Sequence, residues 1–132
     1  MDVNLAINDP AVLGEMTAVF ARYEHALVTN QVEVLDELFF DSALTVRYGA
    51  AENLVGIEAI RAFRLARPAT GLARRLANTV ITTYGRDFAT AMTEFRRDGS
   101  SRVGRQSQTW VRMRAGWRVV AAHVSIIDAA AP

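Results

Sequence analysis

The first half of the chain repeats apolar residues at helical spacing. Asp9-Pro10 combines a capping residue with a proline at the first helical position, which is typical of a helix start. Apolar side chains then recur at steps of three and four as far as Asn30, so one face of this helix is buried. The same reasoning predicts a short second helix, a strand and a third helix over residues 32–39, 44–50 and 56–68.

The second half changes to strand-like segments that are rich in β-branched and aromatic residues. Three turns of hairpin length separate them: Gly85-Arg86-Asp87, Asp98-Gly99-Ser100 and Arg114-Ala115-Gly116. The predicted strands cover residues 76–84, 88–97, 103–113 and 117–127. Helices followed by a meander of hairpins predict an α+β fold, with three N-terminal helices packed on a curved antiparallel sheet. We expect residues 1–132 to form a single domain.

The last predicted strand is apolar on both faces. Apart from Arg118 near its start, one face carries only Val120, Ala122, Val124 and Ile126, and the other is apolar except for His123 and Ser125. A strand of this kind is covered on both sides. The helices supply one cover, and in so short a chain the second cover is expected to be another subunit. The sequence therefore predicts a homodimer formed through the face that carries residues 120, 122, 124 and 126.

Composition narrows the function. No apolar run is long enough to cross a membrane, and Met1-Asp2-Val3-Asn4 lacks the basic region of a signal peptide, so we expect a cytoplasmic protein. Without cysteine and with two histidines, we expect no metal and no cofactor. The net charge of +1 gives no indication of a nucleic-acid partner. All fifteen Lys and Arg residues of the chain are arginine, so each of these cationic side chains ends in a planar guanidinium group, which is suited to binding carboxylates.

Four residues are the first candidates for a ligand pocket. Tyr23 lies in the apolar stripe of the first helix, where its hydroxyl either finds a partner in the core or projects into a cavity. Arg47 lies in the middle of a strand and, if buried, needs an anion, for which we favour a ligand. His123 and Ser125 form a polar pair in an otherwise apolar strand, which is the best internal sign of a pocket.

The other arginines and the strand register leave alternatives open. Arg61, Arg64 and Arg67 recur along one side of the third helix and are interpreted as a solvated face. One of Arg74 and Arg75 points to each face of the sheet; the sequence does not decide which, and Arg75 is taken as the candidate. For the 103–113 strand, a three-residue loop closing at Gly116 would place Arg105, Ser107 and Thr109 beside His123 and Ser125. A two-residue loop over 115–116 would instead present Gln106, Gln108 and Trp110, and we favour the first register.

Several segments resemble one family over most of the chain. They are Arg22-Tyr23-Glu24, residues 35–39, Arg47-Tyr48-Gly49, and the runs 84–91, 104–112 and 116–125. Together they resemble the AtzH-like family, which includes the HpxZ-like proteins of oxalurate catabolism and belongs to the nuclear transport factor 2-like (SnoaL-like) superfamily. Met92 departs from the polar residue expected on the pocket wall of such proteins.

The resemblance implies a cone-shaped fold, a dimer and a role in bacterial nitrogen catabolism beside an amidase-signature hydrolase. It also implies hydrolysis of carboxylated ureas, such as 1,3-dicarboxyurea to allophanate, and it favours a ligand-facing hydroxyl for Tyr23.

Two functions are therefore carried forward. The first is a cofactor-free hydrolase of a small anionic amide, with Tyr23 and Arg47 as catalytic residues. Its predicted substrate-binding residues are His123, Ser125, Arg75, Arg105 and Ser107. The second is a non-catalytic subunit that binds a ligand or assembles with the amidase-signature hydrolase. The polar residues favour the first function, and the lack of a strong nucleophile favours the second.

Overall fold

The computed structural model describes residues 4–128, so the acidic start over residues 1–3 lies outside the described residues. Three helices are present, as predicted: α1 (Pro10–Val28), α2 (Val32–Leu38) and α3 (Ile57–Ala66). The Asp9 carboxylate caps α1 by accepting hydrogen bonds from the backbone N–H groups of Ala11 and Val12, at 3.1 and 3.3 Å. No helix in the described part of the chain is long and apolar enough to cross a membrane.

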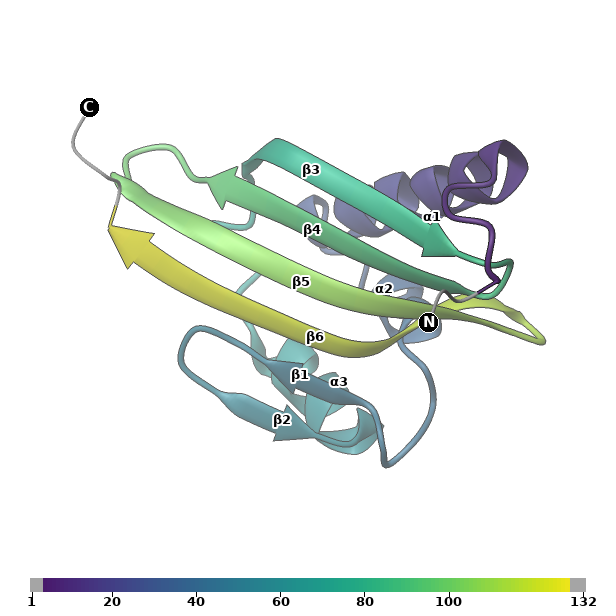
Figure 1. Cartoon of the computed structure of the whole chain (residues 1–132). Helices are drawn as coiled ribbons and strands as arrows, with labels where there is room; N and C mark the ends of the chain where they lie inside the picture. The colour runs from purple at the N-terminus through teal and green to yellow at the C-terminus, as the bar shows by residue number, and fades with distance from the viewer. Residues whose placement is uncertain (1–3, 129–132) are drawn as a thin grey trace.

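Six strands form one curved sheet in the order β2-β1-β6-β5-β4-β3 (Figure 1). All neighbours are antiparallel except β1 and β6, which run parallel. The short β2 was not predicted from the sequence. The strand bounds are β1 (Val46–Tyr48), β2 (Asn53–Val55), β3 (Arg75–Tyr84), β4 (Phe88–Arg96), β5 (Arg102–Met113) and β6 (Gly116–Asp128).

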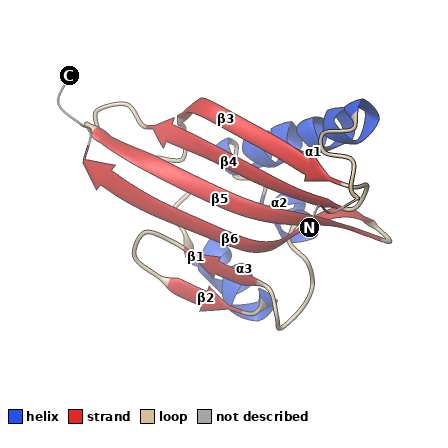
Figure 2. Cartoon of the chain, in the orientation of Figure 1, coloured by secondary structure: helices blue, strands red, loops and turns tan. Residues whose placement is uncertain are grey.

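All three helices lie on the same side of the sheet, and Figure 2 views the molecule from the other side. We call the helix-covered face the inner face and the opposite one the outer face. The core lies between the helices and the inner face, where Met16 of α1, Leu35 of α2 and Trp110 of β5 have no exposed surface. The α+β architecture predicted from the sequence is confirmed.

A β-bulge in β6 decides which side chains face inward. Met113 pairs with Gly116, so the β5–β6 loop has two residues, yet Thr109 pairs with Ala121 while Trp110 pairs with Val119. Val120 is therefore an extra residue, and beyond it the alternation of faces is reversed. The favoured register of Ser107 beside His123 is confirmed, because the bulge supplies the additional residue that we had placed in the loop.

The bulge also corrects the predicted dimer face. Ala122 is buried in the core, and Val124 and Ile126 line a cavity beneath the helices. These residues cannot pack against a second subunit, because the same chain already covers them. The sequence predicts that side chains alternate between the two faces along the whole strand, but the extra residue at Val120 interrupts that alternation.

Candidate functional site

A cavity of about 220 Å³ lies between the inner face of the sheet and helices α1 and α3. Its volume is below the ~300–1,000 Å³ typical of pockets for drug-sized ligands, which favours a small ligand. Apolar side chains such as Leu27, Ile60 and Phe63 form part of its wall. The polar part of the wall is dominated by arginine and consists of Tyr23, Arg47, Glu52, Arg64, Arg67, Arg74, Arg97 and Gln106.

Tyr23 lines this cavity from the buried side of α1, and 5% of the residue is exposed. Neighbouring aromatic rings fix its orientation: Trp110 meets it edge-on at a centroid distance of 6.1 Å, and Phe39 lies at 6.2 Å. Its ring therefore belongs to the core while the residue borders the cavity. The core position that the sequence predicts for the Tyr23 ring is confirmed, and the ligand-facing role of its hydroxyl stays a prediction.

Arg47 lines the same cavity from β1, where the pleat turns Val46 and Tyr48 to the other face. Its Nη1 donates a hydrogen bond of 3.1 Å to the Glu52 carboxylate, and its guanidinium lies 5.6 Å from the centre of the Phe63 ring. The Arg47 side chain is 17% exposed. Its charge is thus already paired, by a carboxylate that sequence reasoning did not single out. Glu52 is the single carboxylate in the wall formed by the described residues.

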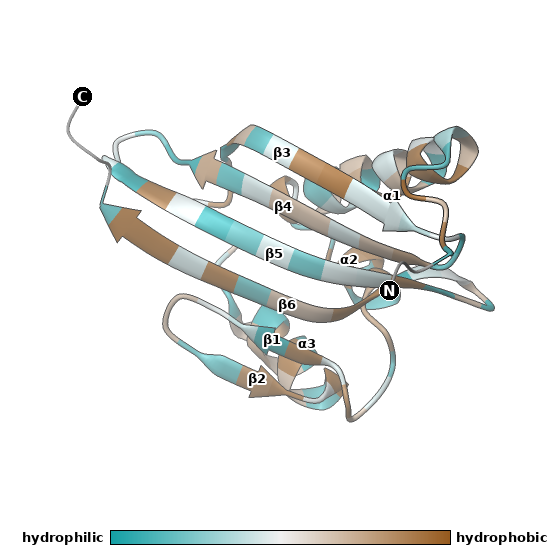
Figure 3. Ribbon diagram, viewed as in Figure 1, coloured by the Kyte–Doolittle hydropathy of each residue, from teal (hydrophilic) through white to brown (hydrophobic). Residues whose placement is uncertain are grey.

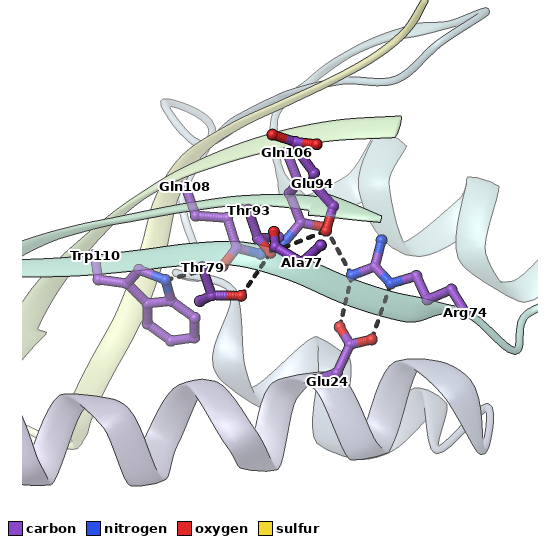
Figure 4. Close-up of polar contacts among 9 residues, drawn as sticks. All are labelled: Glu24, Arg74, Ala77, Thr79, Thr93, Glu94, Gln106, Gln108 and Trp110. Atoms are coloured by element: carbon purple, nitrogen blue, oxygen red, sulfur yellow. Dashed lines mark hydrogen bonds and ion pairs between the residues drawn. The ribbon is translucent and has the colours of Figure 1, made fainter. Parts of the chain in front are cut away.

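Arg74, rather than Arg75, reaches the cavity. Its side chain is 2% exposed and donates two hydrogen bonds to Glu24 of α1, from Nε at 2.9 Å and from Nη2 at 2.6 Å. Nη2 also donates to Oε1 of Gln106 at 3.0 Å, and Figure 4 shows this network at the helix–sheet junction. Arg75 is exposed and pairs with Asp98. The placement of Arg75 in the pocket is therefore wrong, because the pleat turns the first residue of β3 outward.

The predicted solvated face of α3 is also corrected. Arg64 is 5% exposed, donates to Asp36 at 2.7 Å and stacks on Phe39 with 4.7 Å to the ring centre. Arg67, at the C-terminal end of α3, lines the cavity, and its Nε and Nη2 atoms are buried without a hydrogen-bond partner among residues 4–128. Only Arg61, paired with Asp41 at 3.8 Å, matches the expected surface role. Helical spacing predicts that these arginines lie along one side of α3. It does not show which of them are covered by the rest of the protein.

Two cavity arginines are electrostatically strained. Burial lowers the pKa of Arg67, and the neighbouring Arg64 and Arg47 lower it further, against an opposing effect of Tyr23. Burial also lowers the pKa of Arg97, with an added contribution from Arg74 and an opposing one from Glu24. Arginine stays protonated in proteins, so these directions describe a cost of holding positive charge in the cavity. A bound anion would relieve that cost.

The remaining predicted residues lie on the outer face. His123, Ser125, Arg105 and Ser107 share that face, with Arg105 donating to Ser125 at 3.2 Å and Ser107 opposite His123. They do not line the cavity that contains Tyr23 and Arg47. Their expected place in that pocket is corrected by the bulge at Val120, which turns residues 121, 123, 125 and 127 away from the helices.

The profile of the AtzH-like family matches residues 5–130 of this chain. No protein of curated function matches it. A structure of a protein of unknown function from the DUF3225 family of Pectobacterium atrosepticum SCRI1043 is 64% identical and has a TM-score of 0.91. That similarity covers 92% of this chain and 95% of the other.

Two further solved structures support the fold. A cystatin-like fold protein from Burkholderia xenovorans LB400 is 46% identical over 96% of this chain and 100% of its own, with a TM-score of 0.92. An NTF2-like protein of unknown function from Pseudomonas putida KT2440 is 19% identical over 87% and 86% of the two chains, with a TM-score of 0.71. The cone-shaped NTF2-like fold expected from the sequence resemblance is confirmed.

Proposed function

The chain belongs to the AtzH-like family, and from this premise we propose that it is a cytoplasmic, cofactor-free amide hydrolase acting on carboxylated ureas in bacterial nitrogen catabolism. The proposed reaction converts 1,3-dicarboxyurea to allophanate. One terminal carbon–nitrogen bond breaks, the nitrogen keeps the electron pair and gains a proton, and the carboxyl carbon leaves as carbon dioxide or, with water, as bicarbonate.

One observation carries this proposal: Tyr23 and Arg47 come from different elements and line one small cavity rich in arginine. A carboxylated urea is small, planar and negatively charged, which suits both the volume of about 220 Å³ and the guanidinium forks of the wall. Tyr23, whose phenolic group can donate a proton, lines the same cavity as those cations, which supports the proposal.

Arg47 and Tyr23 take different roles in the proposed reaction. Glu52 holds one edge of the Arg47 guanidinium, which leaves other N–H groups of Arg47 to hold a carboxylate or polarise the scissile carbonyl. Tyr23 donates a proton to the leaving nitrogen or orients water. The aromatic packing around Tyr23 keeps its ring in one orientation, so the hydroxyl is positioned before the ligand binds.

The test is to incubate the pure protein with 1,3-dicarboxyurea and related carboxylated ureas and to follow the release of carbon dioxide and the formation of allophanate. We expect turnover by the wild type and loss of turnover in Arg47→Ala. Arg105→Ala is the matched control, because Arg105 is an exposed arginine on the outer face. The hydrolase proposal fails if the pure protein shows no turnover, or if Arg47→Ala and Arg105→Ala are equally active.

The outer face supports the second candidate, a non-catalytic subunit assembling with an amidase-signature hydrolase. Paired positions on neighbouring strands form a row across the sheet, in the order Val80, Met92, Ser107, His123 and Tyr48. Val80, Met92 and Tyr48 are exposed. Met92 thus stands on the outer face rather than on the pocket wall. The assembly function is supported if ligand binds in the cavity without turnover until the hydrolase is added.

For the hydrolase, we propose a different occupant of the same row: a second copy of this chain covers it and forms the homodimer interface. Val80 is 57% exposed, Met92 47% and Tyr48 42%, so this surface leaves large apolar side chains in water. Figure 3 shows a brown, hydrophobic stretch within β3, the edge strand at which the row begins. A second copy would remove this apolar surface from water, which is the usual source of stability for a dimer.

A further inference from the structure

The cavity holds more positive charge than its protein partners neutralise. Of the five arginines in its wall, Arg47, Arg64 and Arg74 are paired with Glu52, Asp36 and Glu24. The remaining two, Arg67 and Arg97, have no carboxylate partner among residues 4–128. The excess is therefore two charges, which one small dianion would balance.

Arg74 shows how this fold pairs a guanidinium with a carboxylate. Its Nε and Nη2 groups, which form one side of the planar fork, each donate to one oxygen of Glu24. In Arg67 the same two atoms, Nε and Nη2, are buried without a partner in the described chain. The side of Arg67 suited to a bidentate carboxylate therefore has no acceptor among residues 4–128, and this position resembles a buried ion pair that lacks its acid.

The fully buried side-chain atoms of the cavity wall that lack a partner among residues 4–128 are all donors. Besides the two atoms of Arg67, the buried Nε2 of Gln106 has no partner in residues 4–128, while its Oε1 accepts from Arg74. Buried donors without acceptors are costly, so they indicate a ligand rich in acceptor atoms. A carboxylate supplies acceptors only, whereas a neutral alcohol or amide would also bring donors.

Arg67 and Arg97 reach the cavity wall from different elements of the fold. Arg67 follows α3, and the pKa of Arg67 responds mainly, after burial, to Arg64 and Arg47. Arg97 follows β4 and stacks on the Phe95 ring at 4.9 Å, as Arg74 does at 4.5 Å. Arg97 also lowers the pKa of Arg67, so the two unpaired cations of this one cavity repel each other, and a ligand with two anionic groups would relieve that repulsion.

We propose that Arg67 and Arg97 bind the two carboxylates of one small dicarboxylate ligand, with Arg67 gripping its carboxylate side-on through Nε and Nη2. This assignment deepens the proposed function and rests on it for the identity of the ligand as substrate. Arg47 and Tyr23 are then left to act on the terminal carbon–nitrogen bond, which joins one of those carboxyl groups to the urea.

The experiment measures binding of unreactive probes by calorimetry. The probes are malonate, succinate and glutarate, with acetate as the monocarboxylate and malonamide as the neutral analogue. The variants are Arg67→Met and Arg97→Met, and the control is Arg61→Met on the solvent side of the same helix. Urea unfolding of each variant separates loss of binding from loss of fold.

We expect the tightest dicarboxylate to bind the wild type about 10- to 100-fold more tightly than acetate, the range that one extra charged hydrogen bond supplies. Arg67→Met and Arg97→Met should each remove most of that preference, while Arg61→Met retains it. The assignment is overturned if a folded Arg67→Met or Arg97→Met binds the dicarboxylates as the wild type does, or if acetate binds equally well.

The two proposals fail in distinguishable ways. If dicarboxylates bind and this binding depends on Arg67 and Arg97, but no carboxylated urea is turned over, the hydrolase proposal fails and the binding-site proposal stands. If carboxylated ureas are turned over and both variants keep the wild-type KM, the binding-site proposal fails and the hydrolase proposal stands.

Discussion

Glu24→Gln tests whether the buried charges of this fold are held in pairs. The Arg74 side chain is 2% exposed and the Glu24 side chain 17%, and they share two hydrogen bonds. The variant leaves a buried guanidinium without a counter-charge, and breaking a buried pair in this way costs about 3–5 kcal/mol. Glutamine keeps one acceptor oxygen for Arg74, so we expect a loss near the lower end, about 3 kcal/mol.

The neighbouring residue provides a matched control. Arg75 pairs with Asp98 at the surface, with side-chain exposures of 67% and 89%. Surface pairs of this kind are typically worth ~0–1 kcal/mol, so Asp98→Asn should unfold nearly as the wild type does. The two acids are partners of consecutive arginines, and the comparison isolates the effect of burial.

Urea unfolding followed by circular dichroism measures both variants. With a slope of about 2 kcal/mol per molar urea, a loss of about 3 kcal/mol moves the midpoint down by about 1.5 M. The double variant Glu24→Gln/Arg74→Met should recover at least about 1 kcal/mol relative to Glu24→Gln, because no unpaired charge remains. The reasoning is refuted if Glu24→Gln and Asp98→Asn lose the same stability.

Three further predictions concern the cavity and the outer face. Arg67→Met should raise the free energy of unfolding by about 1 kcal/mol, the low end of the cost of buried unpaired donors, and a clear loss in urea unfolding would contradict this. Gly49→Ala should lower turnover with little loss of fold, because its Cβ would overlap the carboxylate of Glu52 and displace the partner of Arg47; unchanged kinetics would count against that role. Met92→Glu should give a folded monomer in sedimentation analysis, since a buried unpaired carboxylate costs several kcal/mol, and a persistent dimer would place the interface elsewhere.

The sequence was a good guide where a local pattern determines the structure. The start of α1 at Asp9-Pro10 and the four long strands were predicted within a few residues, because capping residues, helical spacing, β-branched runs and turn residues are local signals. The three-residue β2 has no such signal, since it depends on pairing with β1.

The cavity was harder to predict because it depends on which way side chains face. One extra residue at Val120 exchanged the two faces of β6 and moved His123 and Ser125 out of the site. Arg67 was missed for a related reason: helical spacing identifies a basic side of α3, but only packing decides whether that side meets water or the sheet. Tyr23 and Arg47 were singled out from their places in an apolar helix face and a strand, and the family resemblance added to the case for Tyr23, whereas Glu24 and Glu52 follow only from the contacts that they make.

The turnover of Tyr23→Phe, measured beside its urea unfolding curve, tests the central claim that this cavity is a catalytic centre. The ring remains to fill its place among Phe20, Phe39 and Trp110, so stability should change by about 1 kcal/mol or less. If the hydroxyl takes part in proton transfer, turnover of the carboxylated urea should fall by roughly 100-fold or more. A stable Tyr23→Phe variant with wild-type turnover would contradict the account.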